Sequence, residues 1–199
     1  MLTDSSRTTY WATTNPYTDV NSKQWYNNAI STLTKAGILD GYNDGSFRPD
    51  NPISRAEFAT MAVRFYNKTY TGSDLFTDIS DSWARQYVNT AASVGLIEGY
   101  PDGTFKPNSS ITRAEAITII NRVLERKPVQ QHLLKEMVTW SDNMDAKVWY
   151  YADVQEATNS HTYTVEKATD GSSYEIWKTI QPVRDWGSFE TAWAKAAAN

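Results

Sequence analysis

The chain has 199 residues with 40% hydrophobic and 21% charged residues, and its net charge is −4, a composition typical of a globular protein of one domain or two small ones. A negative chain without a cluster of Lys and Arg argues against nucleic acid or an anionic membrane surface as the main partner. The absence of cysteine excludes disulfides and cysteine-based metal sites, and no apolar run approaches the 18 residues of a membrane span.

Residues 1–16 are rich in Thr, Ser and Asn and show no clear period, so we expect a linker or a loosely docked N-terminal arm. The start of the chain lacks the apolar segment of a signal peptide. If the protein acts outside the cell, we therefore expect the sequence to be a mature chain or a piece of a longer one.

From Tyr17 onward the chain repeats itself. Tyr17-Thr18-Asp19-Val20 recurs as Phe76-Thr77-Asp78-Ile79, and from Trp25 the two copies run in register at an offset of 58 residues. Between Gly37 and Glu57, 11 of 21 positions are identical in the second copy. This degree of self-similarity indicates a repeat architecture, with one repeat over 17–70 and a second over 71–128.

Each repeat is predicted to be a helix, a loop and a second helix. The first helix should begin near Trp25 or Trp83, on an apolar face shared with buried positions, and end at Gly37 or Gly95 in the left-handed conformation. The loop carries an Asp-Gly turn and a proline. The second helix should bury an apolar stripe and pack against the other repeats, because a single hairpin cannot bury both its faces.

The second helix of each repeat opens with a capping box, in which a hydroxyl and a Glu satisfy each other's backbone N–H groups. The residues are Ser54 with Glu57 and Thr112 with Glu115. These structural caps leave Arg55 and Arg113 unexplained, because a cation in the first helical turn lies at the positive end of the helix dipole. The repeated arginine predicts a nearby anion.

A third, degenerate repeat is expected over 129–199. Trp140-Ser141-Asp142 stands for the aromatic-Thr-Asp opening, and the segments 163–166 and 174–177 alternate around an Asp-Gly-Ser turn as in a short β-hairpin. The closing helix should open near Trp186, with Glu190 in the capping role and Ser188 at the position of the arginine. We therefore expect fewer anion sites than repeats.

The two strong copies resemble the S-layer homology domain. The resemblance rests on aromatic-Thr-Asp, a Trp, the Gly-(Ile/Leu)-(Ile/Leu)-x-Gly-Tyr-x-Asp-Gly-(Ser/Thr)-Phe-x-Pro segment and Ile-(Ser/Thr)-Arg-Ala-Glu. It implies a mainly α fold of three helix-loop-helix repeats in a pseudo-threefold, three-pronged spindle with grooves between the repeats. It also implies an extracellular module of a larger surface protein, which anchors that protein to the bacterial cell wall through a pyruvylated secondary cell-wall polysaccharide or modified peptidoglycan.

The resemblance places the arginine of the motif in the ligand groove, which carries over to Arg55 and Arg113 and fails at Ser188. A guanidinium can hold a planar carboxylate, such as that of a pyruvate ketal, by two parallel hydrogen bonds. The structural alternative is an ion pair with an acidic residue of another repeat.

Other candidate ligand residues have structural alternatives of their own. Trp25 and Trp83 could stack on a sugar or fill the core, and Tyr42 and Tyr100 are better placed to reach a sugar. Gly41 and Gly99 could admit a ligand to the backbone or only allow the turn. Asp19 and Asp78 stand at a cap-like distance from a helix, so a structural role is at least as favoured as ligand binding.

No cofactor or metal site is expected. Asp44 and Asp102 lack the ligand pattern of a calcium loop and fit turn chemistry, and His132 and His161 look isolated in the sequence. Glu57 and Glu115 could suggest a glycosidase pair, but both already serve as caps, so we expect no enzyme. The remaining alternative is a self-assembly module of a surface layer that binds no glycan.

Overall fold

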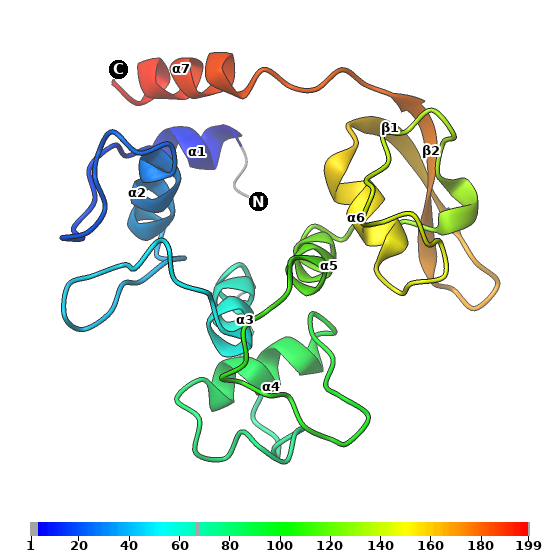
Figure 1. The fold of residues 1–199 in the computed structure, drawn as a ribbon, viewed down its shortest axis with the longest axis horizontal. Coiled ribbons are helices and arrows are strands. Elements are labelled where there is room, and N and C mark those ends of the chain that lie inside the picture. Colours follow the sequence, from blue (N-terminus) through cyan, green and yellow to red (C-terminus); the bar gives the residue numbers. More distant parts are fainter. Residues whose placement is uncertain (1–3, 67, 199) are drawn as a thin grey trace. The chain divides into compact units, whose positions relative to one another are not determined.

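A computed structural model describes residues 4–66 and 68–198 of the chain. Its elements follow in order as α1 (Asp4–Tyr10), α2 (Asn27–Lys35), α3 (Arg55–Arg64), α4 (Arg85–Ser93), α5 (Arg113–Val123), a 3-10 turn (Gln130–His132), α6 (Tyr151–Thr158), β1 (His161–Lys167), β2 (Ser173–Ile180) and α7 (Trp186–Ala197). The prediction of a mainly α chain of helix-loop-helix repeats with one β-hairpin is confirmed (Figure 1).

The contacts divide the chain into two compact units. The first comprises Met1–Ile53, Val63–Lys68 and Asp185–Asn199, and the second comprises Ser54–Ala62 and Thr69–Arg184. In the described residues, no helix combines the length and apolar character needed to cross a membrane. The spindle arrangement of the three repeats stays a prediction.

In the first unit, α1 packs against α2 and α7. The ring of Trp11, just after α1, lies 6.2 Å from that of Trp193 in α7. The amide nitrogen of Ala12 donates to the hydroxyl of Thr32, and Asn27 donates to the carbonyl of Thr13. Polar side chains of α2 thus hold the backbone of Ala12 and Thr13, as the docked-arm alternative for residues 1–16 expected and a free linker would not; residues 1–3 lie outside the described part.

The glycines that end the first helix of each repeat behave as predicted. Gly37 has φ +72° and Gly95 has φ +74°, the left-handed conformation that a helix end favours and that a side chain would strain. The backbone N–H of Gly37 bonds to the carbonyl of Thr34, and that of Gly95 to Ala92. The loop of each repeat thus leaves its helix in the same direction.

The core of the second unit forms around α4, where Val88, Ala91, Leu96 and Phe105 are almost fully buried. The start of α3 is joined to the loop of the second repeat by backbone bonds, from Arg55 to Ser109 (2.9 Å) and from Ala56 to Pro107 (3.0 Å). These bonds place the arginine motif of the first repeat directly on the loop of the second.

The third repeat contains the predicted hairpin. β1 and β2 pair antiparallel from His161 opposite Ile180 to Lys167 opposite Ser173, with an irregularity after Thr162. The turn closes by a bond from the N–H of Ala168 to the carbonyl of Ser172. The cap of α7 differs from the expectation, because Asp185, and not Glu190, accepts the N–H of Ser188.

Candidate functional site

The loop of each strong repeat is held by an aspartate from the segment that precedes it. Asp19 accepts the backbone N–H groups of Phe47 (2.8 Å) and Arg48 (2.7 Å), and Asp78 accepts those of Phe105 and Lys106 (both 2.8 Å). The bond from Phe47 lowers the pKa of Asp19, and the bond from Arg48 adds to this. The structure thus shows the structural role for both aspartates, in support of the loop and not as a helix cap.

Gly41 and Gly99 make room for an aromatic ring. A Cβ atom on Gly41 would lie 2.3 Å from the ring of Tyr17, and one on Gly99 would lie 2.3 Å from the ring of Phe76. Neither glycine has a positive φ. The aromatic residue that opens each repeat therefore packs closely against the glycine backbone.

The Asp-Gly turns show the predicted turn chemistry. The carboxylate of Asp44 accepts the N–H and the hydroxyl of Ser46, and that of Asp102 accepts the same groups of Thr104. These hydrogen bonds lower the pKa of both carboxyls, and the bond from the hydroxyl has the largest effect. The turns are thus closed by hydrogen bonds to their own aspartate side chains.

Residues of all three repeats line a groove of about 290 Å³ in the second unit. Arg55 comes from the first repeat, Gly99 and Tyr100 from the loop of the second, and Trp149 from the third. The remaining wall is formed by residues of the second repeat: Ile97, Glu98, Glu115, Thr118, Ile119 and Arg122. Three of the candidate ligand residues thus share one cavity.

Arg55 is 6% exposed, and other groups of the groove occupy its guanidinium. Its Nε donates to the carbonyl of Phe105 (2.8 Å), its Nη1 pairs with Glu115, and its Nη2 points to the carbonyl of Glu98 (3.4 Å). This is the ion pair between repeats that the structural alternative described. A ligand carboxylate could gain a two-pronged bond to Arg55 only by displacing one of these acceptors.

Both capping boxes form. Ser54 donates its backbone N–H to Glu57 (2.8 Å), and the N–H of Glu57 donates to the Ser54 hydroxyl (3.2 Å). Thr112 and Glu115 make the same two bonds, at 2.9 and 3.2 Å. Glu115 therefore caps α5 with one oxygen and pairs with Arg55 through the other.

Arg113 differs from Arg55. Its side chain is exposed, and within its own unit it forms none of the hydrogen bonds or ion pairs that hold Arg55. Within this unit, the N–H groups of its guanidinium are therefore available to bind an anion. The two arginines of the motif are thus not equivalent.

A second repeated arginine, which was not predicted from the sequence, stabilises the first half of each of the two strong repeats. Arg64 donates to the carbonyl of Ile38 (2.9 Å) and pairs with Asp40 (2.5 Å). Arg122, 58 residues later, donates to the carbonyl of Leu96 (3.3 Å) and pairs with Glu98 (2.7 Å). The repeat offset itself is the signal that could have found this pair, because Arg64 aligns with Arg122 and Asp40 with Glu98.

Thr118 adds an unpaired polar group to the groove. Its side chain is 6% exposed, and its buried hydroxyl finds no hydrogen-bond partner among the described residues. A buried hydroxyl without a partner is uncommon because of its desolvation cost. The lining of the groove thus holds a hydrogen-bonding group that no other described residue satisfies.

The tryptophan of each repeat is exposed. Trp25 is 88% exposed, and Trp83 and Trp149 are each 64% exposed. Each stands two residues before its helix and not on the buried face, so the predicted face was wrong and the core-filling alternative is excluded for Trp25 and Trp83. An exposed indole is a flat apolar surface on which a sugar ring can stack.

The tyrosines of the loops contact cations. The guanidinium of Arg48 lies 4.0 Å from the ring centre of Tyr42. The ammonium group of Lys106 lies 4.0 Å from the ring of Tyr100, and the guanidinium of Arg55 lies 4.9 Å from it. Tyr100 thus contacts two cations, Arg55 of the groove and Lys106 of the loop.

His161 looked isolated in the sequence, but in the structure it has several partners. Its side chain is buried, its ring stacks on Trp177 (3.8 Å between centroids), and its Nε2 lies 2.9 Å from Arg126. Glu156 and Glu175 complete a group of three possible metal ligands. Arg126 pairs with both glutamates, so a protein cation already occupies the centre of this group and the residues do not fit a metal. His132 lies apart from this group and stacks on Tyr174 at 5.2 Å.

Comparison with known proteins identifies the family of the two strong repeats. Residues 16–59 and 75–117 match the model of the S-layer homology domain. The chain is 37% identical over 157 residues to a cellulosome-anchoring protein of Acetivibrio thermocellus, covering 76% of this chain and 34% of the relative. A surface layer protein of Brevibacillus choshinensis is 37% identical over 50% of this chain and 9% of its own length.

An enzyme is also among the relatives, and it matches over a small part of its length. An amylopullulanase of Thermoanaerobacterium thermosulfurigenes is 41% identical over 120 residues, which is 55% of this chain and 6% of the enzyme. The chain thus spans about a third of the cellulosome-anchoring protein and less than a tenth of the other two relatives.

Proposed function

Because residues 16–59 and 75–117 place this chain in the S-layer homology family, we propose that it anchors a larger surface protein to the bacterial cell wall without a covalent bond. The ligand is a secondary cell-wall polysaccharide, recognised through its pyruvylated sugar. As a chain of this family it belongs at the bacterial cell surface. The module has no catalytic role in this proposal, and any activity belongs to the protein that it anchors.

The observation that carries the proposal is the groove between the repeats. It combines an exposed indole (Trp149), a phenol (Tyr100) and an arginine (Arg55) with the unpaired hydroxyl of Thr118. Aromatic faces suit the apolar side of a sugar ring, and hydrogen-bonding groups suit its hydroxyls. This set of groups favours a carbohydrate over an apolar ligand.

The ion pairs of the groove favour an acidic sugar, because a ligand carboxylate can take the place of a protein carboxylate beside an arginine. Arg55 is paired with Glu115, and Arg122 with Glu98, so the resting groove is balanced. The Arg122 side chain is 33% exposed and the Glu98 side chain 79% exposed, and such pairs are weak. A ligand carboxylate can therefore replace Glu98 at Arg122 at small cost, while Arg55 keeps its hydrogen bonds.

Arg113 supports a second anion contact. It occupies the position of Arg55 in the second repeat, is exposed and has no partner within its unit. A guanidinium in that state can form two parallel bonds to a carboxylate with no prior bond to break. We therefore assign to Arg113 a second direct contact with an anion of the polymer, outside the lining of the groove, and assign to Arg55 the positioning of the groove.

The test is a pull-down of the purified chain with isolated cell-wall sacculi, untreated and after acid stripping of the secondary polysaccharide. We expect binding to untreated sacculi and loss of binding after stripping. Binding that survives stripping would move the ligand to peptidoglycan. A chain that binds neither sample and associates with itself as its concentration rises would overturn the proposal in favour of a self-assembly module.

A further inference from the structure

A pocket separate from the groove lies between the end of the second repeat and the hairpin of the third. Its volume is about 370 Å³, and it lies between the segment that follows α5 and the turn of the hairpin. Lys127, Pro128, Val129 and His132 form one side, and residues of the hairpin form the other: Ala168, Ser172, Ser173 and Tyr174. None of these residues lines the groove of Arg55.

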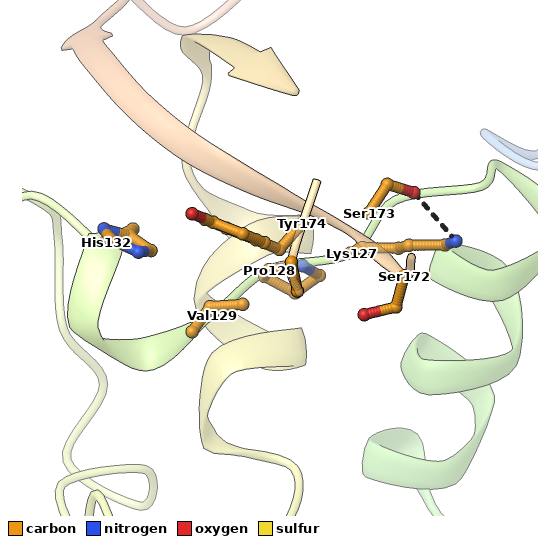
Figure 2. Close-up of a pocket in the computed structure, with 8 residues that line it drawn as sticks. Lys127, Pro128, Val129, His132, Ser172, Ser173 and Tyr174 are labelled. Carbon is orange, nitrogen blue, oxygen red and sulfur yellow. Dashed lines mark hydrogen bonds between the residues drawn. The ribbon is translucent and has the colours of Figure 1, made fainter. Parts of the chain in front are cut away.

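Figure 2 shows a pocket with two different ends. His132 and Tyr174 lie at one end with their rings stacked, 5.2 Å between centroids and 14° between planes. Ser172 and Ser173 lie toward the other end, where the ammonium group of Lys127 donates to the hydroxyl of Ser173 (3.0 Å). One pocket thus offers aromatic and apolar surface, hydroxyl groups and one positive charge.

Buried bonds fix both walls of the pocket. Glu175, which is 2% exposed, takes two bonds from Arg126 (2.9 and 2.8 Å) and one from the backbone N–H of Lys127 (3.1 Å). In return its own N–H donates to the carbonyl of Lys127 (3.0 Å). These bonds hold the Lys127 backbone against strand β2, so the ammonium group stands beside Ser173 before any ligand arrives.

We propose that this pocket binds a single sugar unit that carries one negative group, either a carboxylate or a phosphate. This inference rests on the proposed glycan-binding function. The volume lies within the range of small-molecule sites. The rings and Pro128 meet the apolar face of the sugar, the serine hydroxyls meet its hydroxyl groups, and Lys127 meets the anion as a point charge.

The sequence supplies a reason for a different site in this repeat. Ser188 stands where the first two repeats have Arg55 and Arg113, so the third repeat cannot use the same guanidinium. Lys127, at the end of the second repeat, provides a cation beside the hairpin of the third. The pocket therefore makes a different kind of contact with the wall polymer than the arginine motif does.

The experiment is a titration of the ¹⁵N-labelled chain with three sugars that share one ring: glucuronic acid, glucose 6-phosphate and glucose. We expect a dissociation constant on the order of 1 mM for at least one acidic sugar. The amide signals of Lys127, His132 and Ser173 should shift with that sugar and much less with glucose. The two acidic sugars show whether a carboxylate or a phosphate is preferred.

The matched variants are Lys127→Met and Lys135→Met, because both lysines are exposed and only Lys127 lines the pocket. Lys127→Met should weaken binding of the acidic sugar about tenfold, and Lys135→Met should leave it unchanged. Equal shifts with glucose, or an unchanged affinity of Lys127→Met, would overturn the inference, as would no shift at about ten times the expected dissociation constant. The titration follows amide signals of this pocket alone, and the sacculus pull-down follows binding of the whole chain, so loss of the sugar shifts with retained wall binding would overturn only the pocket proposal.

Discussion

Arg55 and Glu115 lie 60 positions apart in the sequence and form an ion pair in which each partner has a second task. Arg55 also donates from Nε to the carbonyl of Phe105, and Glu115 also accepts the N–H of Thr112. The pair therefore connects the start of α3, the loop of the second repeat and the start of α5. A residue that looks like a helix cap from its motif is also the partner of a buried cation.

This double task predicts that Glu115→Ala is more damaging than the loss of a cap. The change removes the acceptor at the start of α5 and leaves the buried Arg55 without its ionic partner. We expect a loss of about 3 kcal/mol in the free energy of unfolding, measured by urea denaturation. Thr112→Ala, which removes only the hydroxyl of the cap, should cost about 1 kcal/mol. Equal losses in the two variants would show that the ion pair contributes nothing.

The two arginines of the motif should respond differently to substitution. Arg113→Ala should change the free energy of unfolding by less than about 0.5 kcal/mol, as is usual for an exposed residue, and should weaken binding to sacculi. Arg55→Ala should lower stability by about 3 kcal/mol as well as weaken binding. Urea denaturation and the sacculus pull-down measure the two effects, and wild-type binding by Arg113→Ala would exclude its assigned role.

The local structure of the repeats could be predicted because short-range chemistry determines it. The capping motifs, Gly37 and Gly95, the Asp-Gly turns and the alternation of the hairpin each specify the conformation of a few neighbouring residues. Residues 11–13 could not be placed in this way, because their bonds are to side chains 24, 20 and 14 residues away, on α2.

The candidate site was harder to predict because burial depends on the whole fold. Trp25 and Trp83 have the spacing of a buried face, but their helices begin two residues later and leave both rings exposed. Arg55 and Arg113 have the same motif, yet only Arg55 is buried against a neighbouring repeat. The partners of His161 come from α5, α6 and β2 or their flanks, so no local pattern in the sequence predicts them.

Trp149→Ala should weaken binding to sacculi with little effect on stability. The indole is 64% exposed and lines the groove, so its removal takes away a stacking surface and little core packing. Trp177→Ala is the contrast, because that ring is 3% exposed and its loss should cost about 3–5 kcal/mol. If Trp149→Ala binds as the wild type does, the groove does not hold the sugar.

Arg126 should be essential to the third repeat. It holds Glu175 by two bonds and pairs with Glu156, and both carboxylates are almost fully buried. Arg126→Met leaves both without a cation and should cost about 3–5 kcal/mol in the free energy of unfolding. Arg126→Lys should restore only part of this loss, because an ammonium group cannot form the two parallel bonds to Glu175. Full recovery with lysine would indicate that charge alone matters.

The stability of the chain should fall in acid through the carboxyls of its loops. The pKa values of Asp44, Asp102 and Asp19 are lowered in the folded chain by the hydrogen bonds that these carboxylates accept, so the folded state binds fewer protons than the unfolded state. Their stabilisation is present above about pH 4 and is lost as the pH falls through the folded pKa values. Thermal unfolding from pH 7 to pH 2 should show a level melting temperature followed by a decline below about pH 4. Asp102→Asn should melt lower at pH 7 and decline less in acid, whereas an unchanged decline would exclude Asp102 as a source of the acid sensitivity.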